Sequence, residues 1–136
     1  MGDPTESALE RLLLASREAY ENSYSPYSRF RVGAAVLTAD GRLFRGTNVE
    51  NASYGLTVCA ERVAIFSAVA AGAKSMVALA VSMGSPTCEA SERMPCGACR
   101  QVMAEFMAPD AVILLGGEDT CRLSELLPRP FVLPSA

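Results

Sequence analysis

At 136 residues, the chain fits one compact domain spanning residues 1–136. The formal net charge is −3 and the twelve basic residues are scattered rather than grouped in a stripe, which argues against a long nucleic acid as partner and favours a small neutral ligand. Histidine is absent, and this excludes Ser-His and Cys-His nucleophiles as well as every histidine-ligated metal site.

The first part of the chain predicts a helix followed by a hairpin. We expect Asp3 to cap the helix, with Pro4 at its first position, and an apolar face to continue as far as Tyr20. Residues 31–38 and 43–48 then have the pattern of two strands, joined by a turn at residues 39–42.

The remainder predicts two helices, each lying between strands. Residues 49–58 lack a helical or strand-like spacing of apolar residues and predict a loop. The elements expected after it are a helix at 59–71, a strand at 76–83, a polar loop at 84–94, a helix at 97–108 stopped by Pro109, a strand at 112–115, a short strand around Cys121 and a helical turn at 124–127.

A hairpin followed by strand–helix–strand crossovers predicts an α/β fold with a mixed sheet and helices on both faces. We expect a three-layer α/β/α arrangement around five strands. The helices predicted at 59–71 and 97–108 are consecutive, so their N-termini can converge at one end of the sheet.

The five cysteines predict a metal site rather than a disulfide framework. Their number is odd, and Cys96 and Cys99 form a Cys-x-x-Cys pair at the start of one helix, with Cys59 at the start of another. Three thiolates can hold a zinc ion and leave a fourth position open for water. Arg62 and Arg100, each beside a ligand, are placed to offset the negative charge.

Glu61 is the natural proton carrier beside such a metal. It follows Cys59 by two residues, so on an ideal helix the two side chains point in different directions. The two can share one site only if Cys59 lies at the irregular first turn.

Several segments resemble the cytidine deaminases. In chain order they are YSPYSRFRVGAA at 24–35, GTNVENASYG at 46–55, CAER at 59–62, PCGACRQ at 95–101 and ELLPRPF at 125–131. They cover most of the chain. Cys59 stands where other members carry histidine, so the resemblance is to the small, all-cysteine branch of the cytidine/deoxycytidylate deaminase superfamily.

The resemblance implies a zinc-dependent hydrolase that converts cytidine and deoxycytidine to uridine and deoxyuridine plus ammonia in pyrimidine salvage. It implies one Zn2+ per subunit, held by Cys59, Cys96 and Cys99, and a homotetramer. Glu61 would take a proton from water, pass it to ring nitrogen 3, and later protonate the departing amine.

The resemblance also implies the substrate contacts. Asn48 and Glu50 would bind the ribose 3′ hydroxyl, Phe30 would stack near the base, and the backbone near Ala52 and Ala60 would read the base. Tyr54 is counted among the substrate-binding residues without a catalytic task, and Phe131 would reach in from a neighbouring subunit.

The residues themselves support part of this assignment. Asn48 and Glu50 are two apart at a strand end, so they point the same way and offer one amide and one carboxylate to a sugar hydroxyl. Phe30 supplies the flat apolar face that suits a pyrimidine. Without the resemblance, however, Asn48 and Glu50 would be interpreted as turn residues.

Other interpretations stay open at this point. A Cys-x-x-Cys pair alone is as often a structural zinc knuckle or a redox pair. A closed four-cysteine site in a non-catalytic interaction module would need Cys88 as fourth ligand, although a spare cysteine is the simpler interpretation, and Cys121 fits a small core residue. A blasticidin S deaminase-like enzyme shares the cysteine motifs, and an editing deaminase would need a basic groove.

The start of the chain lacks the basic and apolar regions of a secretory signal, and we expect a cytoplasmic protein. The preference between cytidine and deoxycytidine, the tolerance of modified bases, and the roles of the 84–94 loop, Cys88 and Cys121 do not follow from the sequence.

Overall fold

The computed structural model describes residues 3–84, 93–116 and 119–134. The order of its elements is α1 (Glu6–Tyr20), β1 (Val32–Thr38), β2 (Leu43–Thr47), the 3-10 turn η1 (Tyr54–Leu56), α2 (Ala60–Ala70), β3 (Met76–Met83), α3 (Gly97–Phe106), β4 (Met107–Leu115), β5 (Asp119–Arg122) and α4 (Leu123–Leu126). In these residues no helix is both long enough and apolar enough to cross a membrane.

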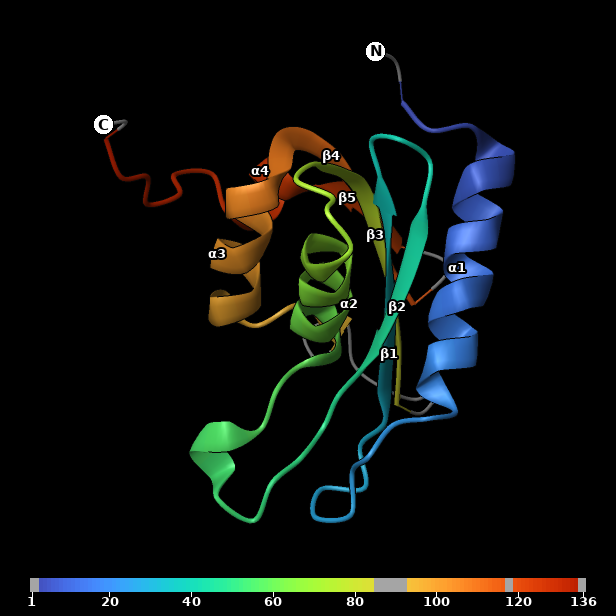
Figure 1. The fold of residues 1–136 in the computed structure, drawn as a ribbon, viewed down its shortest axis with the longest axis vertical. Coiled ribbons are helices and arrows are strands. Elements are labelled where there is room, and N and C mark those ends of the chain that lie inside the picture. The colour runs from blue at the N-terminus through green and yellow to red at the C-terminus, as the bar shows by residue number, and fades with distance from the viewer. Residues whose placement is uncertain (1–2, 85–92, 117–118, 135–136) are drawn as a thin grey trace.

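The strands form one mixed sheet in the order β2-β1-β3-β4-β5. β3 and β4 are parallel and are connected through α3, whereas the other neighbouring pairs are antiparallel. Figure 1 shows α1 on one face of the sheet and α2 and α3 on the other. The mixed five-stranded sheet with helices on both faces is therefore confirmed.

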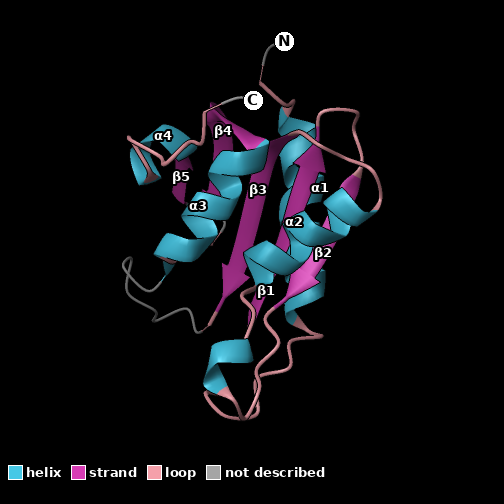
Figure 2. Cartoon of the chain, turned by 60° about the vertical axis from the view of Figure 1, so that its left-hand side comes forward, coloured by secondary structure: helices cyan, strands magenta, loops and turns pink. Residues whose placement is uncertain are grey.

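The two faces of the sheet have separate cores because side chains alternate along a strand. Ala34 and Val36 of β1 face α2 and α3, while their neighbours Ala35 and Leu37 pack under α1. In Figure 2 the β3 arrowhead points toward the end of the molecule where α2 and α3 begin. The carboxyl end of β3 and the two helix starts thus lie at the same end of the sheet.

Two glycines let the helices lie directly on the sheet. A Cβ at Gly33 would lie 2.2 Å from the carbonyl oxygen of Ser16 in α1, and one at Gly46 would lie 2.3 Å from the amide nitrogen of Ala64 in α2. Contacts of this length do not occur between real atoms, so only glycine fits. Gly46 thereby fixes the height of α2 above β2.

The predicted start of α1 at Asp3 is wrong. Thr5 is the N-cap, and its hydroxyl accepts a hydrogen bond of 3.1 Å from the backbone N–H of Ala8. Asp3 instead accepts two hydrogen bonds, of 2.8 and 2.9 Å, from the guanidinium of Arg122. A contact between residues 119 positions apart therefore removes Asp3 from the cap, and Pro4 precedes the helix.

The predicted boundary at Pro109 is also wrong. α3 ends at Phe106, and β4 begins at Met107. The pairing with β3 shifts after the Met76–Met107 pair, so that Ala78 pairs with Val112. Proline has no N–H to donate, and such an irregularity is a place where a strand tolerates it. β4 thus begins five residues before the strand predicted at 112–115. The other boundaries differ by a residue or two, and η1 lies within the predicted loop.

Candidate metal centre and active site

Two of the three candidate zinc ligands are N-cap residues of consecutive helices. Cys59 caps α2 with extended backbone angles of φ −73° and ψ 150°. Cys96 caps α3, and its sulfur accepts a hydrogen bond of 3.4 Å from the backbone N–H of Cys99. The positive ends of both helix dipoles consequently face the sulfurs, where they stabilise thiolates.

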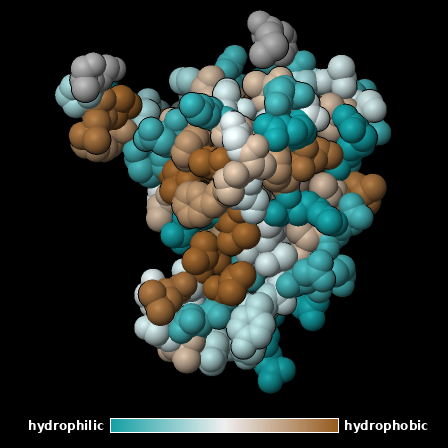
Figure 3. Space-filling view, viewed as in Figure 1, coloured by the Kyte–Doolittle hydropathy of each residue, from teal (hydrophilic) through white to brown (hydrophobic). Residues whose placement is uncertain are grey.

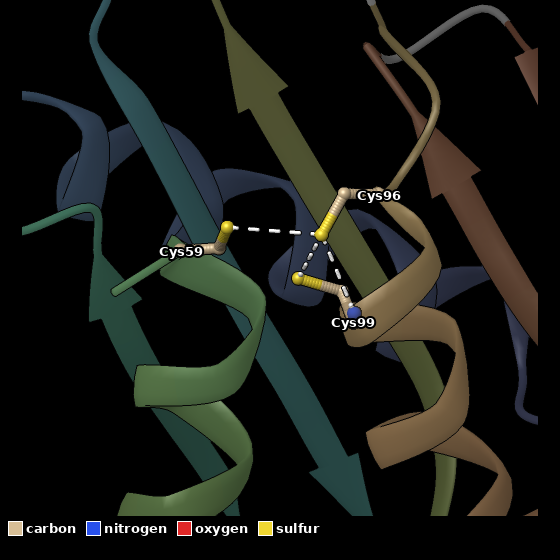
Figure 4. A group of neighbouring side chains, drawn as sticks. All are labelled: Cys59, Cys96 and Cys99. Atoms are coloured by element: carbon tan, nitrogen blue, oxygen red, sulfur yellow. Dashed lines mark hydrogen bonds between the residues drawn. The ribbon is translucent and has the colours of Figure 1, made fainter. Parts of the chain in front are cut away.

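The three sulfurs converge on one point (Figure 4). The Sγ atom of Cys96 lies 3.9 Å from that of Cys59 and 3.3 Å from that of Cys99, and all three sulfurs lie within 4.8 Å of one another. Sulfur atoms on a tetrahedral zinc ion are about 3.8 Å apart, given a zinc–sulfur distance near 2.3 Å. The donor set and the spacing fit zinc.

The surroundings of Cys59 stabilise its thiolate. A hydrogen bond with Cys99, together with the guanidinium of Arg62, lowers the pKa of the Cys59 thiol to about 5. The same hydrogen bond and burial raise the pKa of Cys99. Nη2 of Arg62 donates to the Cys59 sulfur at 3.4 Å, as the sequence predicts for a cation that offsets the thiolate charge.

Glu61 lies beside the sulfurs in the first turn of α2, and only 6% of its surface is exposed. Burial raises the pKa of its carboxyl to about 7, and the negative charge of Cys59 adds to the effect. A carboxyl with this pKa can both take up and release a proton near neutral pH. The N-cap position of Cys59 also supplies the irregular turn that lets residues 59 and 61 share one site.

Arg100 has a different position from the one expected beside the sulfurs. Its Nε donates to the carbonyl of Pro95 at 2.8 Å, and its Nη1 donates to the carbonyl of Leu126 at 2.7 Å. The guanidinium therefore ties the start of α3 to the end of α4. Its role is to position the Cys-x-x-Cys segment.

The amide of Asn48 is buried and engaged on both sides. Its Oδ1 accepts a hydrogen bond of 3.0 Å from the backbone N–H of Val32 and another from the hydroxyl of Ser23. Its Nδ2 donates to the carbonyl of Phe30 at 2.8 Å, and the second N–H of the amide has no acceptor among the described residues. These contacts fix the orientation of the amide.

Glu50 is held by the segment that precedes β1. Its Oε1 accepts hydrogen bonds from the backbone N–H groups of Tyr27, at 2.9 Å, and Ser28, at 3.1 Å, while Oε2 accepts one from the Ser28 hydroxyl. The Ser28 hydrogen bonds keep the pKa of Glu50 below its usual value. The carboxylate borders a cavity of about 320 Å³ that Tyr54 and Thr57 also line.

The sequence of this chain was compared with known protein families. The family model described as the cytidine and deoxycytidylate deaminase zinc-binding region matches residues 6–115. The chain belongs to this deaminase family. The three sulfurs fit the ion that the family model describes, so a zinc ion is the cofactor, one per chain.

Curated members are similar over most of their length. The cytidine deaminase of Halalkalibacterium halodurans is 47% identical over 126 residues, which is 90% of this chain and 92% of that protein. The cytidine deaminase of Sporosarcina psychrophila is 42% identical and covers 90% of both chains.

A solved structure of the cytidine deaminase from Burkholderia pseudomallei superposes with a TM-score of 0.82 at 44% identity, covering 94% of this chain and all of that one. The cytidine deaminase structure from Mycobacterium tuberculosis gives a TM-score of 0.82 at 39% identity, covering 96% of this chain and all of that one. This deaminase therefore has the fold of those enzymes as well as their sequence motifs.

The other residues predicted to contact the substrate differ in how far they are buried. Ala60 is fully buried between Cys59 and Glu61, whereas Ala52 and Tyr54 are exposed on the η1 loop. The ring of Phe30 is half-buried and packs against Gly84 at the end of β3, where an added Cβ would lie 2.7 Å from Cε2 of the ring.

Phe131 does not reach the sulfur cluster of its own chain. Its ring is 69% exposed on the tail after α4, and Nε2 of Gln101 holds its carbonyl at 2.9 Å. In Figure 1 this tail lies at the end of the molecule opposite the starts of α2 and α3.

Among the described residues, Cys121 is the cysteine that lies outside the cluster of Cys59, Cys96 and Cys99. Cys121 is half-buried in β5, where burial raises its pKa. It packs against the core formed by α2 and α3, as a small core residue would. Cys88 and most of the predicted 84–94 loop lie outside the described residues.

Two serines at the site were missed from the sequence. Ser23 contacts Asn48 and Ser28 contacts Glu50, 25 and 22 residues away along the chain. The only sequence signal was the presence of Ser28 in the deaminase-like segment at 24–35, because neither serine has metal-ligating or catalytic spacing.

Proposed function

We propose that this deaminase hydrolyses cytidine and deoxycytidine to uridine and deoxyuridine, with release of ammonia. The observation that carries the proposal is the buried carboxyl of Glu61, with a pKa near 7, beside three convergent sulfurs in a chain that belongs to this family. Cysteine ligands alone would serve a structural zinc site equally well. A buried proton carrier beside them favours catalysis.

When bound, zinc lowers the pKa of a coordinated water to about 7. Glu61 is placed to take the proton of the attacking water and to deliver it to nitrogen 3 of the pyrimidine while carbon 4 is attacked. The carboxylate that remains takes the second proton, from the new 4-hydroxyl group, and gives it to the departing 4-amino group, so that ammonia leaves and the 4-oxo product remains. Arg62 keeps Cys59 in its thiolate form throughout by donating to its sulfur.

In this proposal the substrate is oriented by residues that flank the β1–β2 hairpin, with Phe30 before β1 and Asn48 and Glu50 after β2. Asn48 offers the amide N–H that has no acceptor among the described residues, and Glu50 offers a lone pair of Oε2, to the ribose 3′ hydroxyl. Phe30 supplies an apolar face for the base. The backbone at Ala60 and Ala52 reads the base, and Tyr54 lies beside the sugar-side cavity.

We further propose that residues 1–136 act as one domain within a homotetramer, in the cytoplasm and in pyrimidine salvage. Exposed apolar side chains support the assembly: Leu56, Phe66 and Val69 lie on η1 and α2, and Phe131 lies on the tail. Figure 3 shows apolar surface over the η1–α2 side and on the tail. Phe131 would then complete the site of a neighbouring subunit. Light scattering during gel filtration tests the homotetramer, because it measures the mass of the assembly in solution.

Activity is tested by incubating the zinc-loaded protein with cytidine and following the loss of the aminopyrimidine absorbance together with the release of ammonia. We expect turnover, and a zinc-loaded protein without any would refute the proposal. Glu61→Gln should retain zinc and lose about two to four orders of magnitude in kcat, the usual contribution of general acid–base catalysis.

Glu105→Gln is the matched control, because Glu105 is an exposed carboxylate on α3 whose side chain has no hydrogen bond or ion pair among the described residues. It should keep both zinc and kcat. Full activity in Glu61→Gln would remove Glu61 from the role of proton carrier.

A further inference from the structure

The hydroxyl of Ser28 contacts both Phe30 and Glu50, which are 20 residues apart in the sequence. It accepts a hydrogen bond of 3.0 Å from the backbone N–H of Phe30 and donates one to Oε2 of Glu50. A carboxylate has no proton to donate, so the hydroxyl proton must point at Glu50. Ser28 therefore joins the residue expected under the base to the residue expected at the sugar.

The two oxygens of Glu50 are held in different ways. Oε1 accepts two backbone N–H groups, of Tyr27 and Ser28, which persist whatever side chains the segment carries. Oε2 has the Ser28 hydroxyl as its partner among the described residues. Without that hydroxyl, the two hydrogen bonds to Oε1 still hold one oxygen of the carboxylate, but the carboxylate can turn about that oxygen. Oε2 then loses its fixed position.

The backbone around Ser28 is shaped for this contact. Arg29 has a left-handed conformation with φ 59°, and its N–H donates to the carbonyl of Ser25 at 3.0 Å. A non-glycine residue rarely adopts this conformation, and strain of this kind gathers at ligand sites. The turn brings the N–H groups of residues 27 and 28 and the Ser28 hydroxyl to one carboxylate.

We propose that Ser28 is a positioning residue, which fixes Oε2 of Glu50 relative to Phe30 so that the carboxylate meets the 3′ hydroxyl of a bound nucleoside. This rests on the proposed function. The lowered pKa of Glu50, caused first by the Ser28 hydroxyl, is consistent with it, because an ionised carboxylate only accepts hydrogen bonds and so selects a donor such as a sugar hydroxyl.

The test uses two substrates that differ only at the 3′ position, 2′-deoxycytidine and 2′,3′-dideoxycytidine. In Ser28→Ala, kcat/KM for 2′-deoxycytidine should fall about tenfold, as expected for one lost charge-assisted hydrogen bond. For the dideoxy substrate it should change less than about twofold, because the group that Glu50 binds is absent. Ser28→Thr, which keeps the hydroxyl, should restore most of the discrimination.

Ser75→Ala is the matched control, since Ser75 is an exposed serine before β3 whose side chain has no hydrogen bond among the described residues. Equal losses on both substrates in Ser28→Ala would overturn the positioning role, because a change in folding alone affects both reactions alike.

A second readout does not depend on turnover. Carbon-detected NMR titration of the Glu50 carboxyl should give a higher pKa in Ser28→Ala than in the wild type, and an unchanged pKa would also overturn the role. A wild-type protein that fails to deaminate either substrate refutes the proposed function instead, whatever the titration gives. The two failures are therefore distinguishable.

Discussion

Gly46 in β2 sets the position of the catalytic helix, and Gly46→Ala should move it. The added Cβ would lie 2.3 Å from the nitrogen of Ala64 and 2.5 Å from the carbonyl oxygen of Ala60. Both atoms are backbone, so no side chain can rotate away. An ordinary contact needs about 3.4 Å, so α2 must rise by about 1 Å from the sheet, an overpacking that typically costs about 1–3 kcal/mol.

In the proposed mechanism the displacement acts on catalysis because Ala60 lies between Cys59 and Glu61. A misplacement of about 1 Å in a catalytic group commonly costs about two orders of magnitude in rate. We therefore expect Gly46→Ala to melt about 3–9 °C lower than the wild type and to lose about 100-fold in kcat on cytidine. Calorimetry and steady-state kinetics measure these two effects, and zinc analysis of the purified protein shows whether the loss of kcat occurs with the metal still bound.

Gly41→Ala is the control for this reasoning. Gly41 has φ 89° in the turn between β1 and β2, and nothing lies within 4 Å of an added Cβ. Alanine there costs about 1 kcal/mol of backbone strain and should leave kcat unchanged. The reasoning is refuted if Gly46→Ala keeps wild-type kcat, or if Gly41→Ala loses as much activity as Gly46→Ala.

Three further changes test other contacts. Arg62→Gln removes the cation at the Cys59 sulfur, so zinc affinity measured by chelator competition should weaken about 10- to 100-fold; unchanged affinity would contradict the role. Asp3→Asn removes the ion pair with Arg122, whose hydrogen bonds lower the pKa of Asp3. Because the folded-state pKa is lowered, the ion pair stabilises the fold above the ordinary pKa of 3.8, and this stabilisation is lost as the carboxylate protonates in acid. The melting temperature of Asp3→Asn should be slightly below wild type at pH 7 and equal in strong acid. Arg29→Gly should be about 1 kcal/mol more stable in urea than Arg29→Ala, because only glycine adopts φ 59° without strain.

The sheet and the metal centre could be predicted because their signals are local. Apolar strands such as Met76–Met83 are recognisable from a few neighbouring residues, and the spacing of Cys96 and Cys99 is itself the geometry of two adjacent ligands. The one local uncertainty was the angle between Cys59 and Glu61. The N-cap position of Cys59 resolves it, because a cap residue does not follow the helical repeat.

Long-range contacts explain what could not be predicted. Asp3 and Thr5 are both good helix caps, and the choice between them depends on Arg122 in β5, which binds Asp3. The orientation of the Asn48 amide likewise depends on Ser23 and Val32. No spacing rule connects such residues, since the fold alone brings them together.

The same sulfur atoms serve the helices and the metal. At Cys96 the sulfur takes the place that a serine or aspartate oxygen usually has at a helix start, since it accepts the backbone N–H of Cys99. At Cys59 the cap position directs the thiolate toward the positive end of α2 and toward Arg62. Folding of the first turns of α2 and α3 and assembly of the three-sulfur cluster are therefore one event, and the same first turn of α2 places Glu61 beside the sulfurs.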